Sequence, residues 1–225
     1  MDKFALIGFP AVGSLSPVLF GAAYAGKYEY GFIEQEHFED AWSIFMEGPY
    51  RAVNVTAPHK LAAAQAADWR SPEVDAIGAA NILVKTEEGI KAYNSDYLGV
   101  RYLIKEYAPA AQTCAVIGFG GAGKAAYQAA VDSGLETVVV RHSELAAGVE
   151  ADLIIFTLPK AAEGMEKMRC KVLIEANYRH PECIGLPGVG TYVHGKEWLR
   201  AQALLGYELM TDEKPDGEAI GQVEI

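Results

Sequence analysis

A glycine-rich turn between an apolar strand and a helix restricts the fold more than any other feature of this chain. Thr113–Ile117 is an apolar run typical of a buried strand, and the G-x-G-x-x-G segment Gly118–Gly123 follows it directly. Ala122–Ser133 has a helical pattern that Gly134 ends, and Thr137–Val140 has the composition of the next strand. This order predicts a βαβ unit in a doubly wound, parallel sheet.

The glycines of this turn predict a dinucleotide site. Glycine permits a tight turn and lets the backbone approach a pyrophosphate, whose charge is stabilised by the helix N-terminus. The expected cofactor contacts are Gly118, Gly120, Gly121, Ala122 and Gly123. The alternative is a tight turn without a ligand, because the motif alone is common. The complete strand–turn–helix–strand order favours the cofactor site.

The end of the second strand in this unit indicates which dinucleotide binds. An acid about 20 residues after the glycines binds the ribose of NAD, whereas an arginine suits the extra phosphate of NADP. Arg141 lies at this strand end, and the first acid after it is Glu144. The sequence therefore predicts NADP, with Arg141 as a phosphate ligand. The alternative is that Arg141 is only an exposed surface charge.

A second informative segment, N-V-T-A-P-H-K, places Lys60 at a junction between a strand and a helix. Tyr50–Val55 has the pattern of a strand, Pro58 suits the opening position of a helix, and Leu61–Ala67 continues that helix. Side chains at such a junction point into the space above the strand ends, where α/β folds bind ligands. Lys60 is therefore either a solvated charge or a proton donor to a bound oxygen.

Strand and helix patterns alternate in the N-terminal half. The predicted strands before the lysine are Lys3–Gly8, Tyr28–Ile33 and Tyr50–Val55; the predicted helices run from a Ser16 cap to about Gly26 and over Phe38–Met46. A hairpin of Ile82–Thr86 and Ile90–Tyr93 and a helix over Tyr97–Tyr107 follow. This order predicts a largely parallel sheet covered by helices.

Composition excludes several classes of partner. The chain has 225 residues, 51% of them hydrophobic, which is enough for one large or two small domains. The net charge of −11 argues against binding to nucleic acid or anionic membranes. No apolar run approaches the roughly 18 residues of a membrane span, and the short first apolar run is not a signal peptide. The three cysteines and five histidines lack metal-ligand spacing. We expect a cytoplasmic protein without a metal.

Five segments, in the same order along the chain, resemble the shikimate dehydrogenase family. They are Ile7–Pro10 with Ser14–Pro17, the N-V-T-x-P-x-K stretch Asn54–Lys60, Asn81 in an A-x-N-T stretch, the N-T-D-like Asn94–Asp96, and Gly195 with Leu199, Gln202 and Ala203 in a G-x-x-M-L-x-x-Q-A helix. Each segment alone is weak, but the ordered set extends over nearly the whole chain.

The resemblance implies an α/β fold with two domains. Residues 1–100, joined by the C-terminal helix 195–225, would form an N-terminal α/β substrate-binding and catalytic domain with a mainly parallel sheet. Residues 101–194 would form a Rossmann dinucleotide-binding domain. The implied site residues are Lys60 and Asp96 for catalysis, Ser14, Ser16, Thr56, Asn81, Tyr178 and Gln202 for the substrate, and Gly195 beside the cofactor. The expected assembly is a monomer or a homodimer.

Departures from the family pattern keep three functions open. Phe20 and Gly21 replace a common histidine and asparagine, Phe156–Pro159 replaces an N-A-T-P turn, and Arg141 lacks a second basic residue. The leading hypothesis is an NADP-dependent shikimate dehydrogenase of aromatic amino acid (chorismate) biosynthesis, which interconverts 3-dehydroshikimate and shikimate. The second is a dehydrogenase for quinate or another polyhydroxylated ring acid. The third is a non-catalytic metabolite sensor, which has no need of a proton donor such as Lys60.

Overall fold

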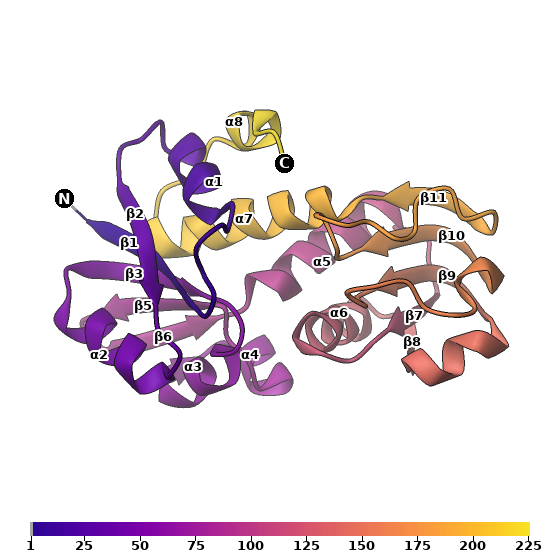
Figure 1. Cartoon of the computed structure of the whole chain (residues 1–225), viewed down its shortest axis with the longest axis horizontal. Coiled ribbons are helices and arrows are strands. Elements are labelled where there is room, and N and C mark those ends of the chain that lie inside the picture. Colours follow the sequence, from indigo (N-terminus) through magenta and orange to yellow (C-terminus); the bar gives the residue numbers. More distant parts are fainter. Residues whose placement is uncertain (1) are drawn as a thin grey trace. The chain divides into compact units, whose positions relative to one another are not determined.

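The computed structural model describes residues 2–225 and divides them into two compact units (Figure 1). The first unit extends to Ser95 and resumes from Ala203 to Glu224, and the second runs from Asp96 to Gln202. Both divisions fall inside helices, α5 (Ser95–Tyr107) and α7 (Gly195–Thr211). The units are therefore joined by two helices rather than by irregular linkers.

The first unit contains a mixed six-stranded sheet in the order β2-β1-β3-β5-β6-β4. Its strands are β1 (Lys3–Gly8), β2 (Glu29–Glu34), β3 (Tyr50–Val55), β4 (Trp69–Arg70), β5 (Ile82–Thr86) and β6 (Gly89–Tyr93). Strand β1 is parallel to β2 and β3, and β4 is parallel to β6, whereas β5 is antiparallel to both of its neighbours. The sheet is mainly parallel, with an antiparallel hairpin next to β3.

Helices cover both faces of this sheet. The remaining helices of the unit are α1 (Ser16–Ala23), α2 (Phe38–Glu47), α3 (Lys60–Ala66), α4 (Pro72–Ile77) and α8 (Gly217–Gln222). One face packs against α2, α3 and α4, because alternate strand residues such as Ile7 and Val53 form a buried core with Phe45 and Ala63. In Figure 1, α1 and α7 cover the opposite face, and α8 lies beside α1.

The second unit contains a wholly parallel five-stranded sheet in the order β11-β10-β9-β7-β8. Its elements are β7 (Thr113–Ile117), α6 (Gly121–Asp132), β8 (Glu136–Val140), the 3₁₀ helix η1 (His142–Ala147), β9 (Val149–Phe156), the 3₁₀ helix η2 (Met165–Lys167), β10 (Met168–Glu175) and β11 (Val189–Val193). The chain turns back between β8 and β9, so the switch point of this sheet lies between β7 and β9. Ligands of doubly wound folds bind at such a point.

Short elements cover one face of the second sheet. Leu145 of η1 and Met165 of η2 are buried there against Ile117 and Phe156, together with Cys183 from the loop after β10. Helix α6 contacts β7, β8 and β9. The unit is therefore a small doubly wound domain in which 3₁₀ turns stand where a larger domain would have long helices.

Several predicted elements are confirmed, and three helix starts in the N-terminal half were wrong. Helix α6 also begins one residue before the predicted Ala122. Strands Lys3–Gly8, Tyr50–Val55 and Thr113–Ile117 have the expected bounds. Ser16 does not cap α1 with its side chain; it is the first helical residue and follows the N-cap Leu15, and the helix ends at Ala23 instead of Gly26.

The other two wrong starts affect the expected catalytic residues. Pro58 does not open α3, because the helix begins two residues later, at Lys60. Helix α5 begins at Ser95, which puts Asp96 inside its first turn rather than before it. Both side chains remain at a helix N-terminus, as the sequence indicated.

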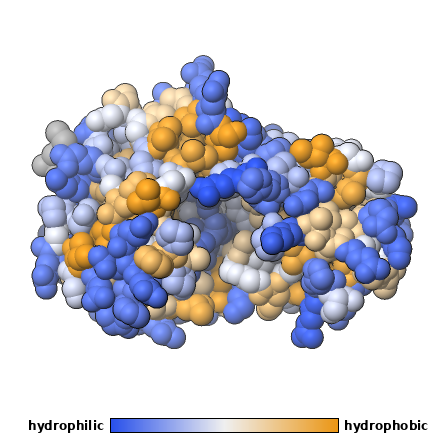
Figure 2. All heavy atoms as spheres, viewed as in Figure 1, coloured by the Kyte–Doolittle hydropathy of each residue, from blue (hydrophilic) through white to orange (hydrophobic). Residues whose placement is uncertain are grey.

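The surface seen in Figure 2 is mostly hydrophilic, with small separate hydrophobic patches. Apolar side chains such as Val12, Val18 and Leu61 are exposed, which is ordinary for a globular protein. Over residues 2–225, none of the helices combines the length and the apolar character that crossing a membrane requires.

Candidate functional site

The ends of β1 and β3 form one edge of the candidate site in the first unit. The Thr56 amide donates to the Ile7 carbonyl at 2.8 Å, and the Phe9 amide donates to the Ala57 carbonyl at 3.1 Å. A Cβ on Gly8 would lie 2.3 Å from Thr56 Cγ2, so only glycine permits this approach. Thr56 is thereby fixed at the end of β3, four residues before the half-buried Lys60.

Asn81 connects three segments that are far apart in the sequence. Its carbonyl accepts from the Val55 amide at 2.8 Å, and the Ala80 amide before it donates to the Lys60 carbonyl at 2.9 Å. Its side-chain oxygen accepts from the Ser95 amide at 2.7 Å, and its Nδ2 lies 3.1 Å from Ser95 Oγ. The strand end before Lys60 and the helix start before Asp96 are therefore both bound to this buried asparagine.

Asp96 and Gln202 lie on two helices that pack closely within the second unit. Asp96 is buried in the first turn of α5, one turn before Gly99. A Cβ on Gly99 would lie 3.0 Å from the Gln202 backbone nitrogen of α7. The absence of a side chain at Gly99 lets α7 approach α5 at Gln202, which fixes the position of this residue relative to Asp96.

The two predicted serines form a hydrogen-bonded pair. Ser14 Oγ lies 3.0 Å from Ser16 Oγ and accepts from the Ser16 amide at 3.2 Å. Glu34, at the end of β2, accepts from the Ala11 and Val12 amides, each at 2.7 Å, and these bonds lower the pKa of its carboxyl. Glu34 therefore holds the loop that carries Ser14, a role that the sequence did not indicate.

Two tyrosines beside Ser16 were also missed. The Tyr207 hydroxyl of α7 donates to the Ser16 carbonyl at 3.2 Å, and the Tyr30 hydroxyl donates to Asn54 Oδ1 at 2.8 Å. Burial raises the pKa of both hydroxyls, against the lowering effect of a hydrogen bond with Ser16. Asn54 Nδ2 in turn donates to the Asn81 carbonyl at 3.4 Å. These contacts connect Ser16 with Asn81.

Phe20 explains one departure from the family pattern. Its ring is fully buried and lies 4.8 Å, between centroids, from both Tyr30 and Tyr207. The aromatic ring that replaces the common histidine is thus part of the packing that positions these two tyrosines. It contributes no polar group of its own.

The glycine turn of the second unit has the shape expected for a pyrophosphate site. Gly118 has φ +90°, and a Cβ on Gly123 would lie 2.3 Å from the Gly118 carbonyl oxygen, so both positions require glycine. By contrast, a Cβ on Gly120 or Gly121 would meet no atom within 4 Å. The amides of the first helical turn, which includes Ala122, have no acceptor within the helix and are left for a ligand or solvent. These residues fit a dinucleotide phosphate.

Thr157, the residue after β9, supports the same turn. Its amide and its hydroxyl donate to the Ile117 carbonyl at 2.9 and 2.8 Å. A Cβ on Gly118 would lie 2.9 Å from Thr157 Oγ1. The segment that departs from N-A-T-P therefore still holds the glycine turn in place.

Arg141 follows the last residue of β8 and is exposed, as the cofactor prediction requires. Its backbone amide donates to Glu144 Oε2 at 2.8 Å, and the Glu144 amide donates to the Arg141 carbonyl at 2.9 Å. The Glu144 carboxylate is thus held at the end of β8. The sequence shows that Glu144 lies three residues after Arg141, but it does not predict this contact.

Gly195 and Tyr178 are brought together in the second unit. A Cβ on Gly195 would lie 2.6 Å from the Asn177 carbonyl carbon and 2.7 Å from the Tyr178 amide nitrogen. Packing between the start of α7 and the turn after β10 therefore accounts for this glycine. A cofactor contact by Gly195 and a substrate contact by Tyr178 stay predictions.

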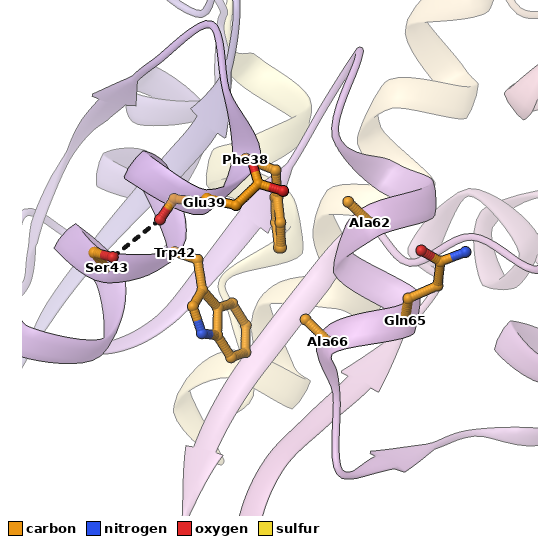
Figure 3. A pocket seen from close by; sticks show the side chains of 7 residues that line it. All are labelled: Phe38, Glu39, Trp42, Ser43, Ala62, Gln65 and Ala66. Carbon is orange, nitrogen blue, oxygen red and sulfur yellow. Dashed lines mark hydrogen bonds between the residues drawn. The ribbon is translucent and has the colours of Figure 1, made fainter.

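A separate cavity of about 420 Å³ lies between α2 and α3 (Figure 3). Phe38 and Trp42 form one wall, Ala62 and Ala66 form the other, and Glu39 is its charged residue. It contains none of the predicted site residues and no cation that could bind an acidic substrate, so we do not assign the active site to it. Within residues 2–225, no three histidine, cysteine or acidic side chains are grouped to hold a metal ion.

Comparisons with known proteins agree with this arrangement. A family model described as the shikimate dehydrogenase substrate-binding domain matches residues 6–83. A shikimate dehydrogenase (NADP(+)) from Dehalococcoides mccartyi is 31% identical over 172 residues, which are 72% of this chain and 59% of that protein. The chain thus spans less than two thirds of that relative. One from Anaeromyxobacter dehalogenans is 30% identical over 91% of this chain and 77% of its own length.

A solved structure is similar over almost the entire chain. The shikimate 5-dehydrogenase from Thermus thermophilus has a TM-score of 0.84 and 26% identity in its complex with shikimate. Its complex with NADP(H) and shikimate has a TM-score of 0.85 and 25% identity. The complex with both ligands is matched over 98% of this chain and 97% of that one. The motifs, the fold and these relatives lead to one conclusion: the chain belongs to the shikimate dehydrogenase family.

Proposed function

We propose that this protein acts as an NADP-dependent shikimate dehydrogenase, which reversibly reduces 3-dehydroshikimate to shikimate on the route to chorismate and the aromatic amino acids. The observation that carries the proposal is the set of hydrogen bonds made by Ala80 and Asn81. The Ala80 amide donates to the Lys60 carbonyl, and the Asn81 side chain accepts from the Ser95 amide, next to Asp96. The relatives named above support the same reaction. The first unit would bind the substrate, and the second would bind the cofactor.

Lys60 would act on the oxygen at which the reaction places negative charge. When a ring ketone is reduced, its oxygen becomes an alkoxide, and an ammonium group nearby can stabilise this charge and donate a proton. Asp96 would hydrogen-bond to the same hydroxyl or its neighbour and orient the lysine. In the reverse direction the neutral lysine would accept the hydroxyl proton.

The other predicted residues would orient the ring. The hydroxyls of Ser14 and Ser16 would donate to the substrate carboxylate, and their mutual hydrogen bond and the Tyr207 contact restrict their positions. Asn81, Thr56 and Gln202 would bind the ring hydroxyls, and Tyr178 would lie near the carboxylate. Correct orientation contributes to the rate because the reacting atoms must be aligned to within about 3–3.5 Å.

The second unit would hold NADP through the glycine turn and Arg141. NADPH, when bound, supplies the hydride for the ketone carbon. Gly118, Gly120, Gly121, Ala122 and Gly123 would surround the pyrophosphate, with charge stabilised by the N-terminus of α6. The net charge of the chain is −11, so local amides and Arg141 must provide the attraction for the phosphates.

A second candidate is quinate, and one observation favours it. Quinate carries an additional hydroxyl on the ring carbon that bears its carboxylate. The Tyr30 hydroxyl donates to Asn54 Oδ1 at 2.8 Å, and an interaction with Ser16 counters the rise in its pKa that burial causes, so it lies near the end of the site where the carboxylate would bind. It offers a polar partner for such a hydroxyl, and a dehydrogenase for quinate or a related ring acid would keep the same mechanism.

The test is a comparison of substrates in one assay. NADP⁺ reduction is followed at the nicotinamide absorbance band with shikimate, quinate and related ring acids offered in turn. The proposal predicts the highest kcat/KM with shikimate, and a higher value with quinate would favour the second candidate. No turnover with any acid, together with measurable binding of one of them, would contradict an enzymatic role and favour a sensor.

A further inference from the structure

We propose that Glu144 is a specificity-determining residue for the cofactor, and that its carboxylate lowers the preference of this protein for NADP over NAD. This inference rests on the proposed binding of a dinucleotide by the second unit. It concerns the end of β8, where the adenosine ribose lies in doubly wound domains that bind such cofactors. The two cofactors differ there by a single phosphate group.

The hydrogen bonds of the structure place an acid and a base at this position. Glu144 Oε2 accepts from the Arg141 amide at 2.8 Å, and the Glu144 amide is bonded to the Arg141 carbonyl at 2.9 Å. These two reciprocal bonds hold the carboxylate against the first residue after β8. Arg141 and Glu144 are both exposed, so both side chains are accessible to a ligand.

The two groups act in opposite directions on the extra phosphate of NADP. The Arg141 guanidinium can form charge-assisted hydrogen bonds with it, as the sequence suggested. The Glu144 carboxylate repels the phosphate and occupies a backbone donor that could bind it. With NAD, the same carboxylate can accept a hydrogen bond from a ribose hydroxyl, which is the role of the acid at this position in domains that bind NAD.

A charge-neutral variant separates these effects from folding. Glu144→Gln keeps a side-chain oxygen that can accept from the Arg141 amide, since glutamine replaces glutamate in capping interactions. It removes only the negative charge. The matched control is Glu150→Gln. Glu150 is also exposed, but it is the second residue of β9 and therefore lies near the N-terminal ends of the parallel strands, whereas the glycine turn follows the C-terminal end of β7.

The measurement is the dissociation constant of NADP⁺ and of NAD⁺ by isothermal titration calorimetry, without substrate. For Glu144→Gln, we expect the ratio of the NAD⁺ to the NADP⁺ dissociation constant to rise by roughly threefold to tenfold, as for removal of one nearby exposed charge. The increase should shrink at high salt, because exposed charges are screened. Glu150→Gln should leave the ratio unchanged.

The other outcomes distinguish an error in the role of Glu144 from an error in the proposed cofactor. An unchanged ratio in Glu144→Gln, with NADP⁺ still bound by both proteins, would overturn the role of Glu144 but leave the proposed function intact. An equal rise in Glu150→Gln would show an effect of net charge and would also overturn it. If neither dinucleotide binds the wild-type protein, both the inference and the proposed cofactor are wrong.

Discussion

Tyr207 shows how a single hydroxyl can influence the candidate site from within a packed core. It is buried, and its hydroxyl donates to the carbonyl of Ser16, whose side chain would bind the substrate carboxylate. Tyr207→Phe keeps the ring packing against Phe20 and removes the hydroxyl that makes this hydrogen bond. We expect a loss of about 0.5–1.5 kcal/mol in the free energy of unfolding, the usual contribution of one hydrogen bond.

The same variant should raise KM for the substrate more than it lowers kcat, because the bond positions a binding group and not the proton donor. Denaturant unfolding and steady-state kinetics test the two parts. Tyr192→Phe is a useful comparison, since it removes a half-buried hydroxyl of the second unit that donates to Glu175 instead. A kcat effect as large as that of a Lys60 variant would contradict a positioning role for Tyr207.

The site residues that the sequence predicted belong to local motifs, whereas those that it missed make contacts with residues far away in the sequence. Lys60, Asn81 and Asp96 belong to short segments whose residue types and order are informative in themselves. Glu34, Tyr30 and Tyr207 act through contacts with residues that are 22 or more positions away. One sequence contains no signal for such pairs, because any polar side chain in a strand or helix can equally be exposed.

In the glycine turn between β7 and α6, the backbone conformation rather than any side chain would form the proposed phosphate site. A Cβ on Gly123 would lie 2.3 Å from the Gly118 carbonyl oxygen, which is backbone and has no freedom to rotate away. Gly123→Ala should therefore displace the turn and weaken NADP⁺ binding by at least about tenfold, whereas Gly121→Ala, where a Cβ meets open space, should perturb the fold less.

Calorimetric titration with NADP⁺ and thermal unfolding of both variants test this difference. Equal stability of Gly123→Ala and the wild-type protein, with unchanged affinity, would show that the turn tolerates a side chain at this position. The glycine spacing predicted the βαβ unit correctly, but it did not distinguish a glycine needed for packing from one that faces a ligand. That distinction depends on the neighbouring backbone.

Asp152 joins three strands of the second sheet and makes its stability depend on pH. Its carboxylate accepts from the Gln112 and Thr113 amides at the start of β7 and pairs with Lys171 of β10 at 2.7 Å. The bond to Lys171 and these amides lower the pKa of Asp152 from 3.8 to about 2. A carboxyl with a lowered pKa stabilises the fold above its unfolded pKa and loses this contribution as pH falls.

We therefore expect the stability that Asp152 provides to disappear between about pH 4 and pH 2. Asp152→Asn should lack this part of the acid dependence and be less stable than the wild-type protein near neutral pH. Denaturant unfolding followed by circular dichroism at several pH values measures both. Parallel pH profiles of the two proteins would contradict the assignment of the effect to this carboxylate.

At the scale of the whole molecule, the two units should respond to different ligands. Shikimate should protect amides in residues 11–16, 54–60 and 79–96 from hydrogen exchange, because these segments contain most of the proposed substrate contacts. NADP⁺ should protect residues 117–124 and 140–145. A ligand at 100 times its dissociation constant stabilises the state that binds it by about 2.7 kcal/mol, which is enough to detect.

Exchange measured by mass spectrometry with each ligand alone tests this division of roles. Protection of residues 117–124 by shikimate alone, with no change near Lys60, would contradict it. The alternation of strands and helices predicted both α/β units, since hydrophobic periodicity is a local property. The strand order of the second unit and the 3₁₀ helices that cover one face of its sheet could not be predicted from the sequence, because they depend on which elements pack together.

The central claim is that Lys60 serves as the proton donor of a shikimate dehydrogenase. The direct measurement is NADP⁺ reduction by shikimate with the wild-type protein and with Lys60→Met, prepared in parallel and compared by circular dichroism. We predict turnover by the wild-type protein and a kcat reduced about 10²–10⁴-fold in the variant, with a smaller change in KM. Wild-type kcat in a folded Lys60→Met protein, or no shikimate-dependent reduction by the wild-type protein, would contradict the claim.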